Sequence, residues 1–500
     1  MSDAMSDGLP EGASPASPHR TAPARPALAS APHGSPLLRS LTGPLARWLP
    51  RQRWFAGKGR PLTGLTLISA TELLPRSEDG SAPGLLHLLV RTRQSSSQPG
   101  APPRDPSGGD CYQLLLGVRA GLPPALAPAL VGRPTEGPLR GLAVYEALHD
   151  ARLAAVLVER LRTPGRLGTL TFGRAGGAEI PGGLPARLLT NEQSNSSVVY
   201  GDSFILKLFR RVSPGVNPDL ELPLALAEAG CPRVPAPAAW FEAAWPGTGT
   251  EPLTLGVLQP FLAGSADGWQ LALRSLTRRA DFTAAAHALG RATAEVHTAL
   301  AAALPTGVLA GAGLEEVAAG MNDRLAEAAS AVPALRPYRA GLGRAYEEVA
   351  AFARNGGSCA VQRLHGDLHL GQVLCAPDRA GRGSLWWVID FEGEPARPLE
   401  DRRGLGPPVR DVAGMLRSFD YAAAQHRESL GSFAEAWSRA NRTAFRRGYA
   451  EAAGGDPAGT AALLRAYETD KAVYEVLYEA RHRPGWLEVP MTAIRRLAAA

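Results

Sequence analysis

The chain has 500 residues, of which 45% are apolar and 20% charged, with a formal net charge of +6. This balance predicts a globular protein of several domains. No segment reaches the roughly 20 consecutive apolar residues of a membrane span, and the arginines are dispersed rather than clustered, which argues against nucleic-acid binding. Four scattered cysteines without a Cys-x-x-Cys pair argue against a zinc site or a disulfide framework and favour a cytoplasmic location.

The N-terminal part is predicted to hold a tail and a small domain. Residues 1–35 are rich in Ala, Pro, Ser and Gly and lack the apolar centre of a secretory signal, so we expect a disordered tail. Residues 36–135 are expected to form a strand-rich N-terminal cap domain. Within it, the Ser, Pro and Gly-rich residues 93–110 predict a flexible loop between two antiparallel strands, Leu85–Thr92 and Cys111–Val118.

Residues 136–262 are predicted to form an intermediate, nucleotide-binding N-lobe. Its patterns indicate an amphipathic helix over Ala143–Arg162 and strands at Leu167–Phe172 and Ala186–Thr190. The apolar run Leu253–Leu262 suits the last strand and the hinge before the next lobe. Between two strands lies a polar loop with four candidate phosphate-binding residues, Ser194, Asn195, Ser196 and Ser197, although a plain polar hairpin would explain it equally.

Lys207 is one of only three lysines, with Lys58 and Lys471, in an arginine-rich chain. Both faces of its predicted strand, Phe204–Phe209, are apolar, so the ammonium must find an anion or lose its charge. An ATP phosphate is the candidate, and a snorkelling lysine at a strand end is the alternative. The next helix offers Glu221 or Glu228 as acidic partner, and we prefer Glu221.

The start of that next helix is ambiguous. Asn217-Pro218-Asp219 is typical of a helix N-terminus. Pro223 interrupts a simple continuation and suggests a later start.

Residues 263–500 are predicted to form a helical C-lobe. The order of strand-rich followed by helix-rich sequence predicts an α+β, two-lobed arrangement behind the N-terminal domain. The helical patterns cover Phe282–Ala303, Leu314–Ala329, Tyr338–Ala353, Asp411–Tyr421, Phe433–Ala450 and Ala461–Arg481.

Two acidic motifs inside this lobe carry the chemistry. His365-Gly366-Asp367 is followed by Gln372, and the buried-strand pattern Ser384–Ile389 leads to Asp390. Kinase-like phosphoryl transfer needs an Asp that orients the attacking hydroxyl, here Asp367, and oxygen ligands for Mg²⁺, here Gln372 and Asp390. Alone, each motif could be an ordinary turn or strand end. Together and in order they predict a kinase, and Asp411 is expected to brace the loop.

A polar and aromatic stripe lies on the predicted helix Ala461–Arg481. Tyr467, Lys471, Tyr474 and Tyr478 follow at steps of four, three and four residues, and therefore share one helix face. Such a stripe is often part of a core. Here the charged neighbours favour a surface for a polyhydroxylated ligand. His297 and His369 are expected to be structural.

Several segments together resemble the bacterial maltokinases, relatives of the aminoglycoside phosphotransferases. The most specific are Arg53–Arg60, which reads Arg-Trp-Phe-Ala-Gly-Lys-Gly-Arg, and Asp390–Pro395, which reads Asp-Phe-Glu-Gly-Glu-Pro. The similarity extends from about residue 36 to the C-terminus. Other matching segments are Asn191–Ser197, Phe204–Arg210, Gln259–Trp269, His365–Gln372 and Asp470–Pro490.

The resemblance implies a two-lobed, protein-kinase-like fold preceded by an N-terminal cap domain, together with an activity and a set of roles. ATP and maltose would give ADP and maltose 1-phosphate for glycogen or α-glucan synthesis, with maltose supplied by a trehalose synthase as partner. Asp367 would be the catalytic base, Gln372 and Asp390 the Mg²⁺ ligands, and Lys207 the phosphate-binding residue. The implied sugar-binding residues are Lys471, Tyr474, Tyr478 and Glu488.

Two other functions are compatible with parts of the pattern. An aminoglycoside phosphotransferase would share the acidic motifs, but a cationic substrate favours an acid-lined pocket, and the expected sugar surface carries Lys471 and Arg481. A non-catalytic scaffold for a glucan enzyme is the other possibility. Loss of Asp367, Asp390 or Lys207 would mark it, and all three are present.

Overall fold

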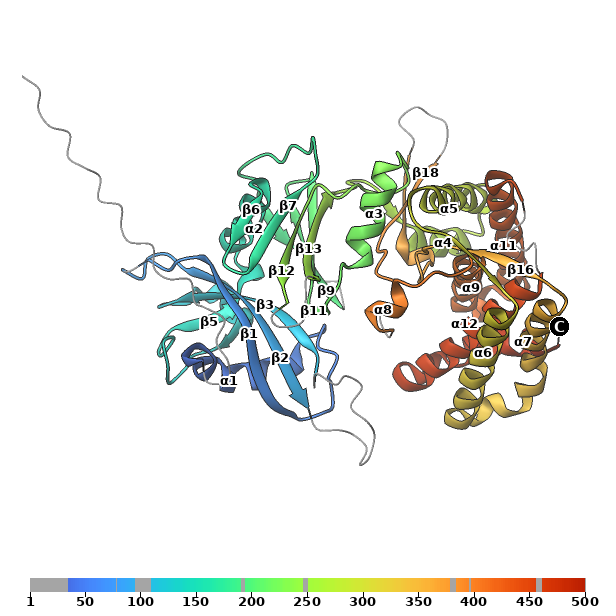
Figure 1. The fold of residues 1–500 in the computed structure, drawn as a ribbon, viewed down its shortest axis with the longest axis horizontal. Coiled ribbons are helices and arrows are strands. Elements are labelled where there is room, and N and C mark those ends of the chain that lie inside the picture. The colour runs from blue at the N-terminus through green and yellow to red at the C-terminus, as the bar shows by residue number, and fades with distance from the viewer. Residues whose placement is uncertain are drawn as a thin grey trace, which may run out of the picture.

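A computed structural model describes residues 35–77, 79–94, 109–189, 194–245, 251–377, 384–394, 397–455 and 461–499. Along the chain it forms a first sheet with one helix, a second sheet with two helices, and a helical lobe (Figure 1). Each region has its own apolar core. The predicted α+β, two-lobed architecture behind a cap is confirmed. The predicted tail, except Ser35, and most of the predicted 93–110 loop lie outside the described residues.

The cap contains α1 and a sheet with the order β1-β2-β3-β5-β4. Strands β2 and β3 are antiparallel neighbours, as predicted. Side chains alternate along β2, so that Leu86, Leu88 and Val90 enter the core of the cap while Leu85 and Leu89 enter the core of the second region. The sheet is thus buried on both faces. The bounds are α1 Pro36–Trp48, β1 Leu62–Leu74, β2 Gly84–Gln94, β3 Cys111–Arg119, β4 Leu130–Gly132 and β5 Ala143–Glu146.

The cap extends further than the predicted boundary at residue 135. Strand β5 pairs with both β3 and β4, so the cap's own strands extend to Glu146. The helix expected over Ala143–Arg162 is therefore too long. Helix α2 covers Ala151–Arg162 only, because the side chain of Asp150 caps it by accepting a hydrogen bond from Arg152 N.

The second region is a seven-stranded sheet with the order β6-β7-β12-β13-β10-β9-β8. Helix α3, Pro218–Glu228, begins at the proline after Asn217, which caps it, and Pro223 lies inside the helix rather than delaying its start. The next piece of chain after β10, β11, leaves this sheet and pairs with β3 of the cap. The strands are β6 Gly165–Leu167, β7 Leu170–Arg174, β8 Ala186–Leu188, β9 Asn195–Tyr200, β10 Phe204–Phe209, β11 Arg211–Val212, β12 Ala239–Ala244 and β13 Pro252–Pro260.

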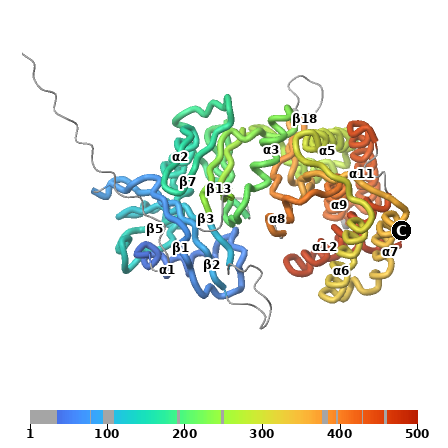
Figure 2. The backbone as a smooth tube through the Cα atoms, in the orientation of Figure 1, coloured from blue at the N-terminus to red at the C-terminus, as the bar shows by residue number. Residues whose placement is uncertain are grey.

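The helical lobe follows β13, and Figure 2 traces its path from yellow-green to red. All six predicted helices are present. Helices α5 and α11 lie very close together at Gly290. A Cβ atom at this position would lie only 2.1 Å from the Phe445 carbonyl oxygen, so only glycine fits there. The main helices are α4 Gly268–Thr277, α5 Thr283–Ala303, α6 Ala312–Ala331, α7 Arg339–Arg354, α9 Val409–Gln425, α11 Ser432–Ala453, α12 Ala461–His482 and α13 Glu488–Ala499.

Small strands inside the helical lobe position the acidic motifs. Strand β16, Ser358–Val361, precedes the Asp367 loop, and the antiparallel pair β17, Val373–Pro377, and β18, Ser384–Val388, carries Asp390 at its end. The remaining elements of the lobe are α8 Leu399–Arg402, α10 Arg427–Leu430, β14 Ala266–Asp267 and β15 Gly307–Ala310. Among the described residues, every helix is too short or too polar to cross a membrane.

Candidate active site

The loop that carries Asp367 is held in place by a buried carboxylate. Asp411, on α9, accepts hydrogen bonds from the backbone N–H groups of His365 at 2.8 Å and Gly366 at 2.9 Å. His297 Nε2 lies 3.2 Å from the same carboxylate. Asp411 is 1% exposed, so this arrangement is rigid and dry. The expected bracing by Asp411 and the expected structural place of His297 are confirmed.

Asp367 forms an ion pair with Lys471 of α12. The Lys471 Nζ atom lies 2.9 Å from Asp367 Oδ1. Burial alone would raise the pKa of Asp367, but the Lys471 ammonium and nearby His369 outweigh burial and hold that pKa below its usual range. Asp367 is therefore a carboxylate at neutral pH, which is the state that can accept a hydroxyl proton.

The Asp390 loop packs directly against the Asp367 loop. A Cβ atom on Gly366 would lie 3.3 Å from the Cα atom of Gly393, and His365 Nε2 lies 2.9 Å from the Ile389 carbonyl oxygen. Asp390 has a φ of 66°, a left-handed conformation that strains a non-glycine residue. Its carboxylate also receives a side-chain hydrogen bond from Gln372. The three residues predicted from the two acidic motifs thus belong to one site.

Lys207 crosses from the second sheet to the Asp390 loop. Its Nζ atom lies 2.8 Å from Asp219 Oδ2, 2.5 Å from Asp390 Oδ1 and 2.6 Å from Glu392 Oε1. Asp219, on α3, also accepts a hydrogen bond from the backbone N–H of Phe391. These contacts join the second region to the helical lobe at the lysine for which phosphate binding is predicted.

Glu221 is not the partner of Lys207, so that prediction is wrong. Its two carboxylate oxygens accept hydrogen bonds from Arg363 Nη1 and Nη2 at 2.9 and 2.8 Å. Because α3 starts at Pro218, the first helical turn presents Asp219 to the site and points Glu221, two residues later, to another side. The sequence signal for Asp219 was its place directly after the Asn217-Pro218 helix start.

One ammonium cannot offset three carboxylates. Burial lowers the tendency of Lys207 to be charged, yet Asp219, Asp390 and Glu392 together hold its pKa well above the usual value. Burial and repulsion from Asp390 and Asp219 raise the pKa of Glu392 despite Lys207, whereas Lys207 outweighs burial at Asp390 and lowers its pKa. The cluster therefore has excess negative charge that suits a further cation.

Oxygen donors for such a cation are close together. Oxygen atoms of Asp219, Asp390 and Glu392 lie within 4.8 Å of one another, and Gln372 contacts Asp390. Carboxylate and carboxamide oxygens are the ligands that Mg²⁺ prefers. The donor set fits the expected Mg²⁺ ligands Gln372 and Asp390. It adds Glu392, to which the sequence analysis gave no role.

The predicted phosphate-binding loop differs from expectation. Asn195, Ser196 and Ser197 belong to strand β9 rather than to a loop, and all three are buried, while Ser194 just before the strand is exposed. Asn195 Nδ2 donates to Glu392 Oε1 at 2.5 Å. Residues 191–193 of the predicted loop lie outside the described residues.

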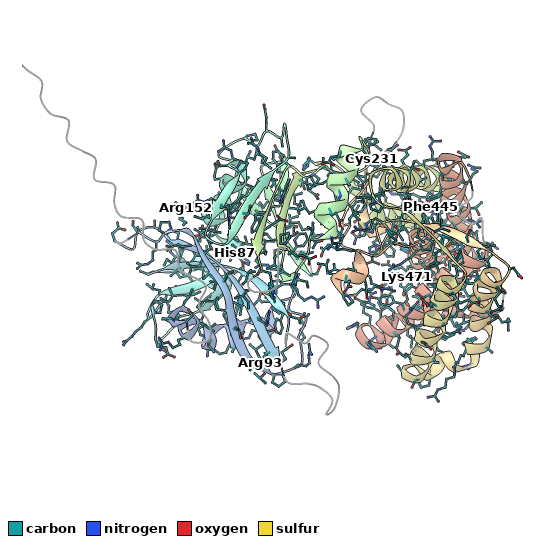
Figure 3. All side chains as sticks on the ribbon, viewed as in Figure 1. His87, Arg93, Arg152, Cys231, Phe445 and Lys471 are labelled. Carbon is teal, nitrogen blue, oxygen red and sulfur yellow. The ribbon has the colours of Figure 1, made fainter. Side chains whose placement is uncertain are left out.

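The predicted sugar-binding stripe is only partly assembled. The Lys471 Nζ atom lies 5.0 Å from the centre of the Tyr474 ring, which stacks on Tyr478 with 6.3 Å between ring centres. Tyr478 is 39% exposed. Lys471 is labelled in Figure 3. Glu488, by contrast, pairs with Arg495 at 2.5 Å and its side chain is 67% exposed, so the described contacts do not join it to the stripe.

Glu394 is a further residue near the stripe that sequence reasoning missed. It is 8% exposed. Burial lowers the pKa of Lys471, but the charges of Asp367 and then Glu394 raise it above its usual value. Burial raises the pKa of Tyr474, and the charge of Glu394 raises it further. Arg397 Nε lies 2.7 Å from the Glu394 carboxylate. It stands four residues after Asp390 in the Asp-Phe-Glu-Gly-Glu run, which was the available signal.

Comparisons with known proteins agree with this architecture. Residues 48–150 match the family model described as the maltokinase N-terminal cap domain. The glucosamine kinase of Mycolicibacterium smegmatis is 32% identical over 331 residues, which cover 62% of this chain and 79% of that protein. The glucosamine kinase of Streptacidiphilus jiangxiensis is 29% identical over 361 residues, covering 68% and 78%.

Solved structures show the same fold. A glucosamine kinase in complex with glucosamine, ADP and inorganic phosphate superposes with a TM-score of 0.61 at 23% identity, over 90% of this chain and 98% of that one. A second crystal form of a glucosamine kinase gives a TM-score of 0.62, also at 23% identity, over 87% and 94%. With the capped, kinase-like fold and the sequence identity to the mycobacterial enzyme, this chain belongs to the maltokinase-like family of sugar kinases that includes the glucosamine kinases.

Proposed function

We propose that this protein transfers the γ-phosphate of ATP to a hydroxyl group of a small sugar. Two ion pairs carry the proposal: Lys207 pairs with Asp390, and Lys471 pairs with Asp367. The loops that hold the two aspartates are in contact with each other. In this proposal a nucleotide phosphate binds on the Lys207 side and an acceptor hydroxyl binds on the Lys471 side. Both reactants would meet at Asp367.

Asp367 is the proposed catalytic residue. As a carboxylate of lowered pKa, it orients the acceptor hydroxyl and accepts its proton while the bond from the sugar oxygen to phosphorus forms and the bond to the ADP oxygen breaks. Asp411 keeps the loop in position throughout. Lys207 holds the phosphates, and Gln372 and Asp390, with Glu392 beside them, would hold Mg²⁺. That cation would offset the negative charge of the transferring phosphate.

Glucosamine is the acceptor we favour. Two of the relatives are glucosamine kinases. The buried carboxylate of Glu394 is paired with Arg397 and lies near Lys471 and Tyr474, where its oxygens can accept a hydrogen bond from an amino sugar. Maltose, the acceptor implied by the sequence resemblance, is the second candidate because the cap matches the maltokinase family model. With maltose, the product would be maltose 1-phosphate, and a trehalose synthase would be the expected source of substrate.

A comparison of acceptors tests this proposal. The kcat/KM of the purified protein with Mg²⁺-ATP is measured for glucosamine, maltose, glucose and an aminoglycoside. We expect glucosamine to give the highest value and the aminoglycoside the lowest. A higher value for maltose would replace the preferred acceptor, and the absence of phosphorylation of every sugar would refute the function.

A further inference from the structure

One buried carboxamide of the cap forms hydrogen bonds with the second sheet. Gln113, on β3, is 0% exposed, and its Nε2 atom donates hydrogen bonds to the carbonyl oxygens of Phe209 at 2.9 Å and Leu255 at 2.8 Å. Phe209 is the last residue of β10, and Leu255 lies within the neighbouring strand β13. The backbone N–H of Gln113 also donates to the Arg210 carbonyl oxygen at 2.8 Å. A single cap residue therefore satisfies three backbone acceptors of the second region.

His87, on β2, fixes the orientation of this carboxamide. Its Nε2 atom lies 3.0 Å from Gln113 Oε1. Because the Gln113 amino group already donates to two carbonyls, Oε1 accepts, and His87 Nε2 must carry the proton. Burial lowers the pKa of His87 to about 4, so the ring is neutral and can adopt this tautomer. Figure 3 labels His87 where the cap meets the second sheet.

Arg210 forms the second connection, immediately after β10. Its side chain is 2% exposed, and its Nη2 atom lies 3.0 Å from Glu146 Oε1 on β5 of the cap. Its Nε atom donates to Ser196 Oγ on β9 at 2.8 Å. Trp54, from the specific Arg-Trp-Phe-Ala-Gly-Lys segment, lies over the guanidinium at 5.0 Å. Arg210 is thus shared between the cap and the hairpin β9–β10.

These contacts lie next to the nucleotide-binding residues. Lys207 stands two residues before Phe209, whose carbonyl Gln113 holds. Asn195, which donates to Glu392, stands one residue before Ser196, which receives the bond from Arg210. A displacement of the β9–β10 hairpin would therefore move the side chains of Lys207 and Asn195 relative to the Asp390 loop. Buried strands transmit such shifts because interiors are close-packed.

We propose that the cap domain is a positioning element of the nucleotide site, acting through Gln113 and the Glu146–Arg210 pair to fix Lys207 and Asn195. These are positioning residues, since they touch the hairpin rather than the reactants. The inference rests on the proposed ATP binding at Lys207. It assigns to the cap a role in nucleotide affinity, independent of the sugar.

The test measures ADP binding by calorimetry, with Mg²⁺ and without sugar, in Gln113→Leu and Glu146→Gln. We expect the Kd for ADP to rise roughly tenfold in Gln113→Leu and roughly threefold in Glu146→Gln, as for weakened buried hydrogen bonds, with a matching rise in the KM for ATP. The KM for sugar should stay within about twofold of wild type. Glu146→Gln keeps the side-chain volume, so it decides the question if Gln113→Leu does not fold.

Arg160→Met is the matched control. Arg160 Nη2 donates to the Leu73 carbonyl oxygen at 2.9 Å, a contact between α2 and the cap that does not touch β9 or β10. We expect its Kd for ADP to equal that of wild type even if its melting temperature falls. If the cap only stabilises the fold, Glu146→Gln will also lower the melting temperature without changing the Kd for ADP. That result would overturn the inference. Failure of the wild type to bind ADP would instead refute the proposed function.

Discussion

The two lysines of the site have different surroundings. Lys207 is 13% exposed and contacts three carboxylates from two lobes, whereas Lys471 is 27% exposed and contacts one carboxylate and an aromatic ring. We call the Lys207 cluster the phosphate half and the Lys471 stripe the sugar half, after the ligands proposed for them. In the phosphate half three carboxylates already contact one ammonium. The sugar half is more open and offers rings and few charges. This difference explains why nucleotide chemistry is easier to infer here than the identity of the sugar.

Asp367→Asn should have the largest effect, because Asp367 stands where the two halves meet. We expect kcat to fall by about 10³-fold, as for loss of a general base, with the Kd for ADP unchanged. Initial rates and calorimetry measure the two quantities. Activity close to wild type would show that the halves do not meet at this carboxylate.

Lys207→Met should disable the phosphate half alone. Without the ammonium, Asp219, Asp390 and Glu392 repel the nucleotide phosphates, so we expect the KM for ATP to rise about 10- to 100-fold, the size of one or two charge-assisted hydrogen bonds. The KM for sugar should change little. An equal rise in both constants would contradict the division into two halves.

Lys471→Met should act on the sugar half, with a smaller effect of about tenfold on the KM for sugar. Because the Lys471 ammonium lowers the pKa of Asp367, its removal raises that pKa, and the acid limb of the kcat profile should move to higher pH. Glu488→Gln is the control, since Glu488 pairs with Arg495 and faces solvent. An unchanged pH profile in Lys471→Met would remove Lys471 from contact with the base.

The smallest effects concern stability, and they should have opposite signs in the two halves. The pKa of Asp367 is lowered, so its charge stabilises the fold above about pH 4, and this contribution is lost as the pH falls through the lowered pKa. The pKa of Glu392 is raised above its usual 4.5, so its charge costs stability as the pH rises through the raised pKa. Both predictions apply to protein freed of metal and nucleotide.

Melting curves between pH 4 and pH 7 measure this contrast. At pH 7 we expect Asp367→Asn to melt below wild type and Glu392→Gln above it, each by less than about 1 °C, for shifts under about 1 kcal/mol in a chain of this size. The Glu392→Gln difference should shrink toward pH 4, whereas the Asp367→Asn difference should persist to about pH 4 and shrink only below it. If both variants change the melting temperature in the same direction, the excess negative charge is not confined to the phosphate half.

The backbone order of the fold was largely predictable, but the partners of individual side chains were less so. Buried strands such as β10 and long amphipathic helices such as α11 have strong periodic patterns that sequence reasoning detects. Asp367, Gln372 and Asp390 were recognised because the chemistry needs those residue types at short spacing. The extent of the cap was misjudged because β5 is only four residues long and pairs with strands far from it in sequence.

The site predictions that were wrong or incomplete depended on the residue at which a helix begins and on contacts between residues far apart in the sequence. Asp219 and Glu221 are two residues apart on one helix, so the choice between them depends on which residue begins α3, and Pro223 obscured that start. Glu488 was placed in the sugar site through the resemblance, but its nearest cation, Arg495, lies on the same helix. The carboxamide of Gln113 joins residues 142 positions apart, a contact that no local pattern encodes.

Phosphorus NMR of the reaction tests the central claim most directly. Wild-type protein with Mg²⁺-ATP and glucosamine, or maltose, is compared with Asp367→Asn under the same conditions. The account predicts that wild type forms ADP and one sugar phosphomonoester in equal amounts, and that the variant forms almost none. Undiminished ester formation by the variant, or release of ADP and free phosphate without any sugar ester, would contradict it.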